Sequence, residues 1–361
     1  MRIPARGRGL IGTLLVLVLL GAGALLLGYH YLVQQYRAPG PAAQAARIEV
    51  APGSSLRSVL ARLQAQGVVA NARAISWYLK LKNQQVRVES GVYEIPAHAS
   101  PEAILQLFAE GRVVLEQLTV VEGATFAEFI ALLDAHPAVA HTLRGRTPGE
   151  VMAALGHPGE LPEGRFFPDT YRFAARSSDA AVLTLAYDAM QRALDSAWES
   201  RAPGLPFSDP AQALILASMV EKEAALKSER ALIAGVFIER LRKGMRLQSD
   251  PTVIYGLGAA YDGTIHTRDL QADNPYNTYT REGLPPGPIC LPGRESLVAA
   301  VHPEESGALY FVATGLGDGA HHFSRTLEEH NAAVQAYLKH LRAPPHAAQG
   351  AGSAAPPGRR R

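Results

Sequence analysis

The spacing of apolar and polar residues changes several times along the chain. Residues 10–27 carry no charge and are mostly Leu, Val, Gly and Ala. From Ile48 to Val50 apolar and polar side chains alternate as in a half-buried strand, whereas apolar residues recur at helical spacing over 56–63 and 72–81. Short strand patterns and separate helical patterns continue to about residue 341. This mixture predicts an α+β fold after the N-terminal stretch.

The uncharged stretch is long enough to cross a bilayer, which takes about 20 apolar residues in a helix. Arginines precede it and tyrosines lie at or after its end, namely Arg2, Arg6, Arg8, Tyr29, Tyr31 and Tyr36. This order is typical of a cytoplasmic N-terminus and an aromatic belt at the far surface. A cleaved signal peptide is the alternative, but the run exceeds a usual signal core and no small-x-small site follows. We expect residues 1–9 in the cytoplasm and an uncleaved single-pass anchor over 10–32.

Composition divides the rest of the chain into a linker, two folded parts and a tail. Residues 33–46 contain two prolines and a glycine and predict a short linker. Residues 47–114 read as a smaller unit of strands and helices, and 115–342 continue without a low-complexity break as a mixed α+β domain. Residues 343–361 are rich in Ala, Gly, Pro and Arg, so we expect a disordered tail.

The overall composition is that of a folded protein with little excess charge. The 361 residues are 47% hydrophobic and 19% charged, enough for two or more domains with cores of their own. The net charge is +2 and no basic cluster lies beside a recognition motif, so nucleic-acid binding is not expected. The histidines lack metal-ligand spacing and no phosphate loop or dinucleotide fingerprint occurs, so neither a metal nor a cofactor is expected. The single Cys290 cannot form an internal disulfide and is expected to be a buried, inert thiol.

One acidic residue interrupts an otherwise apolar helix face. Ser208-Asp209-Pro210 is a helix start signal, and helical spacing runs from Ala211 to about Leu226. The residues that share a face with Glu221 are small or apolar: Leu214, Ala217, Ser218, Ala224 and Ala225. A carboxyl group buried against such a surface, without a cation, has a raised pKa and can act as a general acid. Glu221 is therefore the candidate catalytic residue.

The second acid of the same helix has a simpler explanation. Glu223 is followed four residues later by Lys227, in the order that favours a helical ion pair. The sequence thus predicts a surface role for Glu223 and a buried role for Glu221. Because an isolated Glu more often reaches water at a helix edge, the choice of Glu221 depends on the segments around it.

Three later segments are rich in hydrogen-bonding and ring side chains: 246–256, 273–279 and 283–289. Alternating Asn, Thr and Tyr suits a sugar polymer, because amides bind hydroxyl and acetamido groups while rings cover the sugar face. The other interpretation is an ordinary loop held together by its own Asn and Thr side chains. The pattern from Met245 to Ile254 is strand-like, and the prolines of the third segment predict a stiff loop.

Several motifs occur in an order that is similar to one family. They are Ala217-Ser218-Met219-Val220-Glu221-Lys222-Glu223, residues 244–256, Tyr276-Asn277-Thr278-Tyr279, residues 283–289, Phe167-Pro168-Asp169-Thr170-Tyr171 and Phe323-Ser324. Together they resemble the endolytic murein transglycosylases of the MltG (YceG-like) family, over nearly everything from about Ile48 to Leu341. Residues 50–56 also look like the opening of a LysM-like module. The resemblance therefore implies a LysM-like subdomain at 47–114 and a catalytic YceG-like domain at 115–342.

The resemblance implies a peptidoglycan lytic endotransglycosylase that cuts without hydrolysis. In that reaction Glu221 would protonate the glycosidic oxygen between N-acetylmuramic acid and N-acetylglucosamine. The carboxylate would then take the proton of the muramic C6 hydroxyl as a 1,6-anhydro ring closes. Such cuts within nascent glycan strands end their elongation. The resemblance also implies the inner (cytoplasmic) membrane, a periplasmic catalytic domain, and peptidoglycan strands and cell-wall synthases (penicillin-binding proteins) as partners.

The expected substrate-binding residues come from the same motifs: Ser218, Gln248, Asp250, Asn277 and Tyr279. Two other functions stay open at this point. A hydrolytic muramidase would use Asp250 or Glu223 as nucleophile or base, at the separations found in glycosidases. An anchored, glycan-binding scaffold would use only the LysM-like module and would not depend on Glu221.

Overall fold

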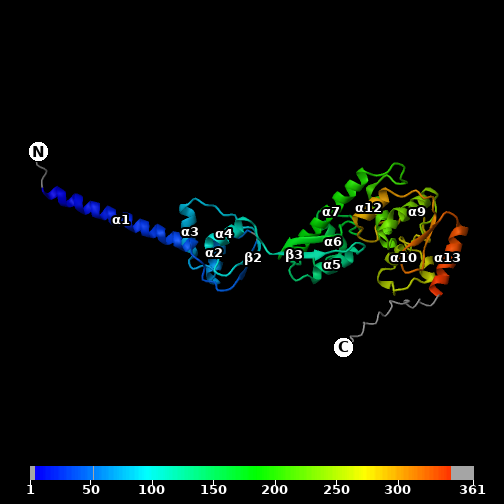
Figure 1. The fold of residues 1–361 in the computed structure, drawn as a ribbon, viewed down its shortest axis with the longest axis horizontal. Coiled ribbons are helices and arrows are strands. Elements are labelled where there is room, and N and C mark those ends of the chain that lie inside the picture. The colour runs from blue at the N-terminus through cyan, green and yellow to red at the C-terminus, as the bar shows by residue number, and fades with distance from the viewer. Residues whose placement is uncertain (1–4, 52, 343–361) are drawn as a thin grey trace, which may run out of the picture. The chain divides into compact units, whose positions relative to one another are not determined.

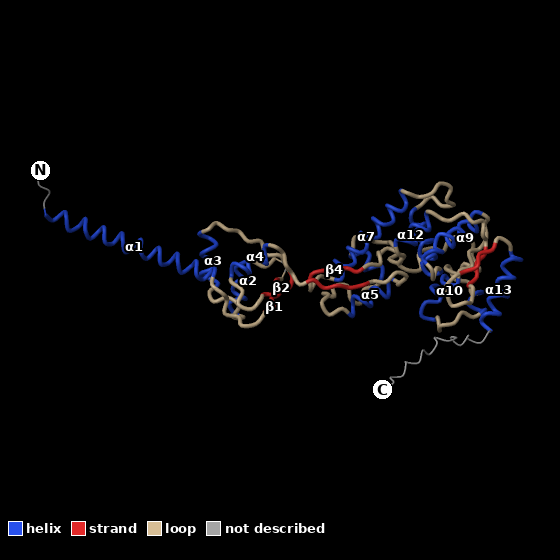
Figure 2. Tube along the Cα trace, viewed as in Figure 1, coloured by secondary structure: helices blue, strands red, loops and turns tan. Residues whose placement is uncertain are grey.

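A computed structural model describes residues 5–51 and 53–342 of the chain (Figures 1 and 2). Within these residues, helices predominate and are accompanied by three two-stranded sheets, so the expected mixed α+β fold is confirmed. The described chain forms two compact units. The first unit holds the residues up to Leu118 together with Leu133–Arg144 and Tyr171–Val182, and the second unit holds the others.

The division between the units differs from the expected boundary between residues 114 and 115. Strand β3 (Leu115–Thr119) pairs with β4 (Thr170–Ala174), and most of both strands belongs to the first unit. This pairing joins segments that are far apart in the sequence. Local periodicity does not detect such pairing, because it reports only on near neighbours.

The N-terminal helix α1 (Ala5–Arg37) is longer than the expected anchor. It contains the one candidate membrane span among the described residues, Thr13–Arg37, which is long and apolar enough to cross a bilayer. The helix continues through 33–37, where composition predicts a linker. Tyr36 is buried there and stacks on Tyr78, with ring centres 4.3 Å apart. Packing of this last turn against the first unit explains why it stays helical.

The first unit is built around two antiparallel strands and three helices. Strand β1 (Ala46–Val50) pairs with β2 (Gly91–Ile95), from Ala46 opposite Ile95 to Val50 opposite Gly91. The helices are α2 (Leu56–Ala65), α3 (Ala72–Leu81) and α4 (Pro101–Ala109). Each begins after a capping side chain, Ser55, Asn71 or Ser100. A single buried core joins all five elements.

The other elements carry the rest of the chain. Helices α5 (Phe126–Ala135) and α6 (Pro148–Ala154) lie between β3 and β4 in the sequence, and α7 (Asp179–Glu199) follows β4. The second unit continues with α8 (Pro210–Glu223), α9 (Arg230–Arg242), α10 (Asp250–Leu257), α11 (Thr267–Gln271), α12 (Arg294–Val301), β5 (Tyr310–Ala313), β6 (His321–Ser324) and α13 (Leu327–Arg342). Its core centres on α8, which packs against α9 and α12.

The strand-like segment from Met245 to Ile254 is not a strand, and this prediction is wrong. Its second half belongs to α10. Pro251 lies in the first turn, where its fixed φ favours a helix, and the Thr252 hydroxyl donates to the Ser249 carbonyl at 2.7 Å. Two of the β-branched residues that suggest a strand, Thr252 and Val253, are buried in this short helix, so tertiary packing outweighs their local preference.

Candidate active site

Helix α8 carries two acidic residues into its last turn. It begins at Pro210, after Asp209 has accepted a hydrogen bond from the Ala211 amide at 2.7 Å. Most of its side chains are buried, and it ends at Glu223, where the next residue turns to an extended conformation. Residues two apart on a helix point in different directions. Glu221 and Glu223 therefore lie in different surroundings.

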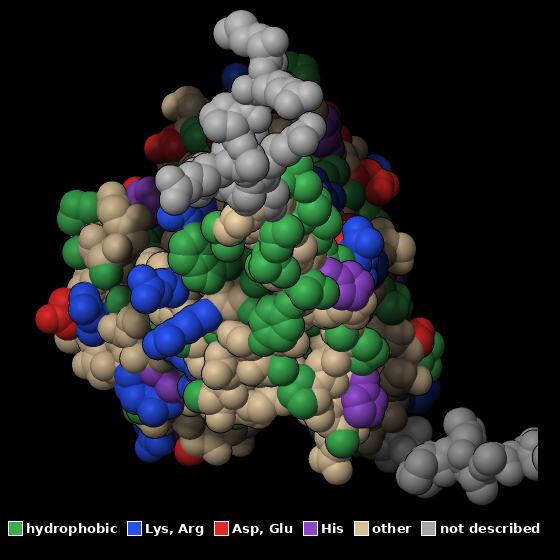
Figure 3. Space-filling view, turned by 90° about the vertical axis from the view of Figure 1, so that its left-hand side faces the viewer, with side chains coloured by type: hydrophobic (Ala, Val, Ile, Leu, Met, Phe, Trp, Pro, Cys, Tyr) green, Lys and Arg blue, Asp and Glu red, His purple; other side chains and the backbone are tan. Residues whose placement is uncertain are grey.

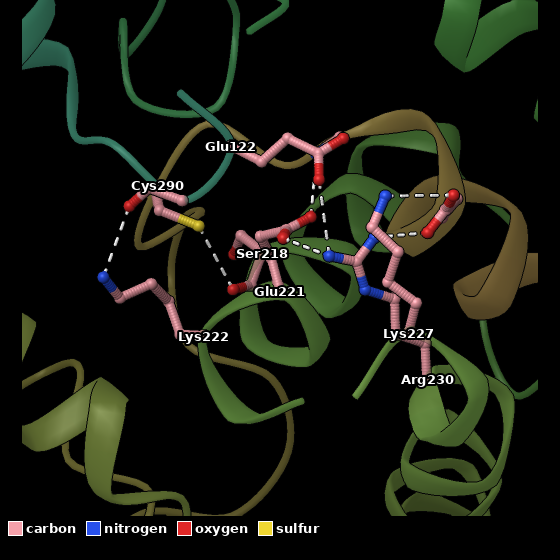
Figure 4. A network of polar contacts seen from close by, with 10 residues as sticks. Glu122, Ser218, Glu221, Lys222, Lys227, Arg230 and Cys290 are labelled. Atoms are coloured by element: carbon pink, nitrogen blue, oxygen red, sulfur yellow. Dashed lines mark hydrogen bonds and ion pairs between the residues drawn. The ribbon is translucent and has the colours of Figure 1, made fainter. Parts of the chain in front are cut away.

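The Glu221 side chain is buried, with 4% of its surface exposed, as the sequence predicts. One carboxyl oxygen accepts a hydrogen bond from Arg230 Nη2 at 2.7 Å, and the other accepts one from the Gly293 amide at 2.9 Å. The prediction that no cation lies beside Glu221 is therefore wrong. Arg230 comes from the first turn of α9, so the periodicity of α8 does not predict its position. Figure 4 shows the Arg230 guanidinium pointing at Glu221 and Glu122.

Arg230 is the centre of a cluster of charges. Besides Glu221 it bonds Glu122 at 3.4 Å, as Figure 4 shows. It also bonds Glu295 at 3.2 Å. Its own side chain is 7% exposed, and its Nε is buried without a hydrogen-bond partner among the described residues. Lys227 also bonds Glu295, at 3.2 Å. One oxygen of Glu221 thus belongs to an ion cluster and the other is held by the Gly293 amide, and together these contacts tie α8 to α9 and α12.

Glu223, the other acid of α8, is bonded by a hydroxyl and not by a cation. Its carboxyl oxygen Oε2 accepts a hydrogen bond from the Ser249 hydroxyl at 3.1 Å. The expected ion pair with Lys227 is wrong, because Lys227 bonds Glu295 instead. Burial raises the pKa of Glu223 to about 7, and the nearby charge of Asp250 adds to this effect, while the Ser249 hydroxyl opposes it. His321 and Arg240 also favour the charged form, but burial outweighs them.

Three of the predicted substrate-binding residues gather near Glu223. The Tyr279 hydroxyl donates to Asp250 Oδ1 at 2.6 Å, and burial together with Asp250 raises the pKa of Tyr279, so its hydroxyl stays protonated. Gln248 is exposed and has a positive φ of 52°, and its side-chain oxygen accepts a hydrogen bond from Arg240 Nη1 at 3.4 Å. Asp250 is also exposed. Asp250 and Tyr279 thus lie near the Glu223 carboxyl, and Gln248 contacts Arg240, whose charge also acts on Glu223.

The other two predicted residues are buried and bonded within the protein. Asn277 Nδ2 donates to three backbone carbonyls of residues 269–272, and its oxygen accepts from the Tyr279 amide at 2.9 Å. Ser218 donates to the Ile215 carbonyl at 2.7 Å and accepts from the Ile289 amide at 3.0 Å. The interpretation of a loop held by its own side chains therefore applies to Asn277. Ser218 fastens the proline-rich segment to α8.

The three polar segments meet at one pocket of about 540 Å³. Its lining takes residues from each segment or its immediate flank: Arg246, Pro275, Thr280, Arg281, Glu282, Leu284 and Pro286. Arg246 Nη1 donates to the Tyr279 carbonyl at 3.2 Å, which joins the first segment to the second. An open pocket with polar groups and rigid proline edges suits part of a glycan chain.

The sequence does not predict the burial of a third acid, Glu163. Burial raises the pKa of Glu163 to about 7, while hydrogen bonds from the Phe126 amide at 3.0 Å and the Tyr255 hydroxyl at 3.1 Å oppose the shift. Glu163 lies in a loop between α6 and β4, so no helix or strand period marks it. Its bonds hold together the start of α5 and the end of α10, which indicates a structural role.

The remaining predictions concern metals and the single thiol. In the described part of the chain, no group of three or more His, Cys, Asp or Glu side chains could hold a metal ion. Cys290 is free and buried, as expected, and burial raises the pKa of its thiol. Its Sγ donates to the Ser218 carbonyl at 3.3 Å (Figure 4). A buried thiol with a raised pKa is inert.

Comparisons with known proteins show which family and which proteins this chain is similar to. The sequence model of the YceG-like family matches residues 48–336. The endolytic murein transglycosylase of Bacillus subtilis is 32% identical, over 81% of this chain and 84% of that protein. The endolytic murein transglycosylase of Streptococcus pneumoniae strain D39 is 26% identical, over 91% of this chain and 65% of that protein. A crystal structure of a YceG-like protein from Listeria monocytogenes covers 80% of this chain and 99% of that chain, with 31% identity and a TM-score of 0.49.

Proposed function

This chain belongs to the YceG-like family, and from that premise we propose that it is an endolytic peptidoglycan transglycosylase with Glu223 as its acid and base. The observation that carries the assignment is the Glu223 carboxyl at the end of α8, which is bonded by the Ser249 hydroxyl instead of a cation and lies near the exposed Asp250. Burial raises its pKa to about 7. The names of the relatives support the reaction class. The named activity of those relatives also favours an enzyme over a binding scaffold.

Glu223 and Glu221 differ in the contacts of their carboxyl oxygens, and burial raises the pKa of Glu223 to about 7. A general acid needs a proton at neutral pH and an oxygen within reach of the substrate. Both oxygens of Glu221 accept hydrogen bonds, one of them from a cation. Among the described residues, Glu223 accepts a hydrogen bond only on Oε2, from Ser249. We therefore assign the acid role to Glu223 and a structural role in the ion cluster to Glu221.

The proposed reaction uses one carboxyl group twice. Protonated Glu223 gives its proton to the glycosidic oxygen, and the bond from that oxygen to C1 of N-acetylmuramic acid breaks. The C6 hydroxyl of the same sugar then attacks C1 and gives its proton to the Glu223 carboxylate. The products are a 1,6-anhydro end and a free hydroxyl on the other sugar, and Glu223 is protonated again. No second carboxylate is needed, because no water is activated.

The other proposed roles follow from position. Gln248, Asp250 and Tyr279 bind the sugars beside Glu223, while Asn277 and Ser218 hold the loops that carry them. The LysM-like subdomain binds N-acetylated glycan. Helix α1 anchors the protein in the inner membrane with the catalytic domain in the periplasm, where it cuts nascent strands, ends their elongation and meets the cell-wall synthases.

The test is mass spectrometry of glycan products. Full-length protein in detergent is incubated with purified peptidoglycan and with nascent, uncrosslinked strands, beside Glu223→Gln, Glu221→Gln and Asp250→Asn. We expect 1,6-anhydro ends from the wild type, none from Glu223→Gln, and activity from Glu221→Gln in proportion to its folded fraction. Thermal unfolding of each variant gives that fraction.

Other results would change the assignment. Loss of activity in well-folded Glu221→Gln, with activity kept in Glu223→Gln, would return the acid role to Glu221. Reducing ends, abolished by Asp250→Asn as fully as by Glu223→Gln, would identify a hydrolytic muramidase. No cleavage of either substrate by the wild type would favour the binding scaffold.

A further inference from the structure

Helix α3 lies across the end of α1 in the first unit (Figure 1). Three contacts fix it there. Tyr78 stacks on Tyr36, the Asn71 amide donates to the Tyr31 hydroxyl at 3.2 Å, and Lys82 Nζ lies 5.6 Å from the centre of the Tyr29 ring. Both ends of α3 thus contact tyrosines that follow the apolar stretch of α1. A helix that crosses a membrane span in this way runs along the membrane surface.

The face of α3 that points away from the core combines apolar and basic side chains. Arg73, Trp77, Lys80 and Leu81 share this face by helical spacing, and all four are exposed. Trp77 is 59% and Leu81 is 61% exposed, although both are large and apolar. Lys80 Nζ lies 5.4 Å from the centre of the Trp77 ring. Exposed Trp and Leu flanked by cations are typical of helices that lie in a membrane interface.

The length of α1 sets the depth of this face. From Leu10 to Tyr29 a helix rises about 30 Å, the thickness of the hydrocarbon core of a bilayer. With the uncharged stretch in the core, Tyr29 lies at its far boundary. Because α3 contacts Tyr29 and Tyr31, it lies at the depth of the lipid headgroups.

The charge of this region suits anionic headgroups. Between Glu49 and Glu89 the sequence contains no acidic residue and six basic ones, Arg57, Arg62, Arg73, Lys80, Lys82 and Arg87. Three of these (Arg57, Arg73 and Lys80) line a groove of about 750 Å³ between α2 and α3, together with Trp77. Basic side chains also gather beside apolar ones on the N-terminal face of the molecule (Figure 3). Basic residues near a membrane surface attract anionic lipids.

We propose that the outer face of α3, formed by Arg73, Trp77, Lys80 and Leu81, lies in the headgroup layer of the bilayer that α1 spans. Trp77 and Leu81 contact the upper acyl chains, and the cations bind the phosphates of anionic phospholipids. The inference rests on the anchor part of the proposed function and is independent of the catalytic chemistry. A glycan is the competing occupant of the groove, but it does not explain the exposure of Leu81.

Quenching of tryptophan fluorescence by brominated lipids tests the proposal. The chain has two tryptophans, so Trp198→Phe leaves Trp77 as the reporter, and Trp198 stacks on another ring that a Phe can still contact. The full-length protein is placed in nanodiscs of phosphatidylcholine and phosphatidylglycerol, with bromine at carbons 6 and 7 of the acyl chains. We expect strong quenching of Trp77, and none of Trp198 in the matched Trp77→Phe variant.

A third variant separates failure of this surface from failure of the anchor. Leu20→Trp in a chain without other tryptophans reports on insertion of α1. Quenching at position 20 without quenching of Trp77 would overturn the proposal and leave the anchor intact. Absence of quenching at both positions would overturn the surface and the anchor together. Emission of Trp77 that changes with added chitin oligosaccharide and not with brominated lipid would assign the groove to a glycan.

A change in lipid charge tests the role of the basic side chains separately. We expect weaker quenching of Trp77 when phosphatidylglycerol is replaced by phosphatidylcholine, and also in Arg73→Gln/Lys80→Gln. Equal quenching in the two lipids would overturn the role of anionic headgroups. These readouts do not depend on glycan cleavage, so an inactive preparation does not affect them.

Discussion

The hydroxyl of Ser249 donates a 3.1 Å hydrogen bond to the carboxyl group of Glu223. This bond joins the last residue of α8 to the residue that precedes α10, and hence two of the sequence motifs. It stabilises the charged form of Glu223 and so opposes the effect of burial on the pKa. Burial and this hydrogen bond therefore have opposite effects on the pKa of the proposed acid, and the hydrogen bond can be removed by itself.

The rate of glycan cleavage should fall as the pH rises through about 7, the pKa to which burial raises Glu223. The general acid must be protonated, and each pH unit above its pKa lowers the protonated fraction about tenfold. The measurement is kcat/KM for release of anhydro ends between pH 5 and 9. A rate that stays constant from pH 6 to 9 would contradict the assignment of Glu223.

Replacing Ser249 by Ala should raise the pH at which the rate of glycan cleavage falls. The substitution removes a hydrogen bond that favours the carboxylate, so the pKa of Glu223 rises further and the protonated form persists to higher pH. The same pH series is measured for Ser249→Ala and for Ser200→Ala, a control whose hydroxyl bonds the Ala197 carbonyl. If the rate of Ser249→Ala fell at a lower pH than that of the wild type, the hydrogen bond would not favour the carboxylate form of Glu223.

Removal of the Arg230 cation should destabilise the second unit. Arg230→Met leaves buried Glu221 without its cation, and breaking a buried ion pair in this way costs about 3–5 kcal/mol. Thermal unfolding of Arg230→Met is compared with that of Arg281→Met, which removes an exposed pair with Asp273 worth about 0–1 kcal/mol. Equal unfolding temperatures for the two variants would argue against the ion cluster.

The double variant Arg230→Met/Glu221→Gln refines this prediction. It removes the buried carboxylate together with its cation, so its loss of stability should be smaller than the sum of the two single losses. Additive losses would mean that the two side chains are not coupled.

Addition of a methyl group at Gly235 should disturb the packing of α9. A Cβ built there lies 2.1 Å from the carbonyl oxygen of Glu304, a backbone atom that cannot rotate away. We expect Gly235→Ala to cost about 1–3 kcal/mol, as overpacking does. In the matched control, Gly149→Ala on α6, no heavy atom lies within 4 Å of the new Cβ. That change should stabilise by about 0.4–1 kcal/mol, and a loss in the control equal to that in Gly235→Ala would refute the steric reason.

Glu163 should make the stability of the second unit depend on pH. Burial raises its pKa from 4.5 to about 7 in the folded protein, so ionisation is penalised only in the folded state. The free energy of unfolding is therefore highest, as far as Glu163 is concerned, below pH 4.5. It falls as the pH rises through about 7, by at most about 3 kcal/mol. Thermal midpoints of wild type and Glu163→Gln are compared at pH 5 and pH 8. We expect the variant to gain relative to wild type at pH 8, and an opposite change would contradict the sign.

Much of the local structure follows from local signals. Helix α3 has the predicted limits of 72 and 81, because Asn71 caps its first turn and an apolar face continues for its whole length. Helix α8 likewise begins at the Asp209-Pro210 signal. Such elements depend on residues within one or two turns of each other, which a single sequence displays.

The choice between the two acids required contacts that the sequence does not display. The cation beside Glu221 belongs to the next helix, and Ser249, which bonds Glu223, lies 26 residues farther along the chain. Helical spacing predicts that Lys227 pairs with Glu223, but α8 ends before it and Lys227 turns to Glu295. Our proposal of Glu223 therefore depends on tertiary contacts that helical spacing does not report.

The stacking of Tyr36 on Tyr78 has a mechanical consequence. Helix α1 continues without a break to Arg37. No flexible hinge therefore separates the proposed membrane span from the rest of the first unit. Spans tilt when their apolar length exceeds the thickness of the bilayer. Every degree of that tilt would be passed to the strands and helices of the first unit. In the proposed membrane-anchored protein, the thickness of the bilayer therefore sets the angle of the first unit to the membrane surface.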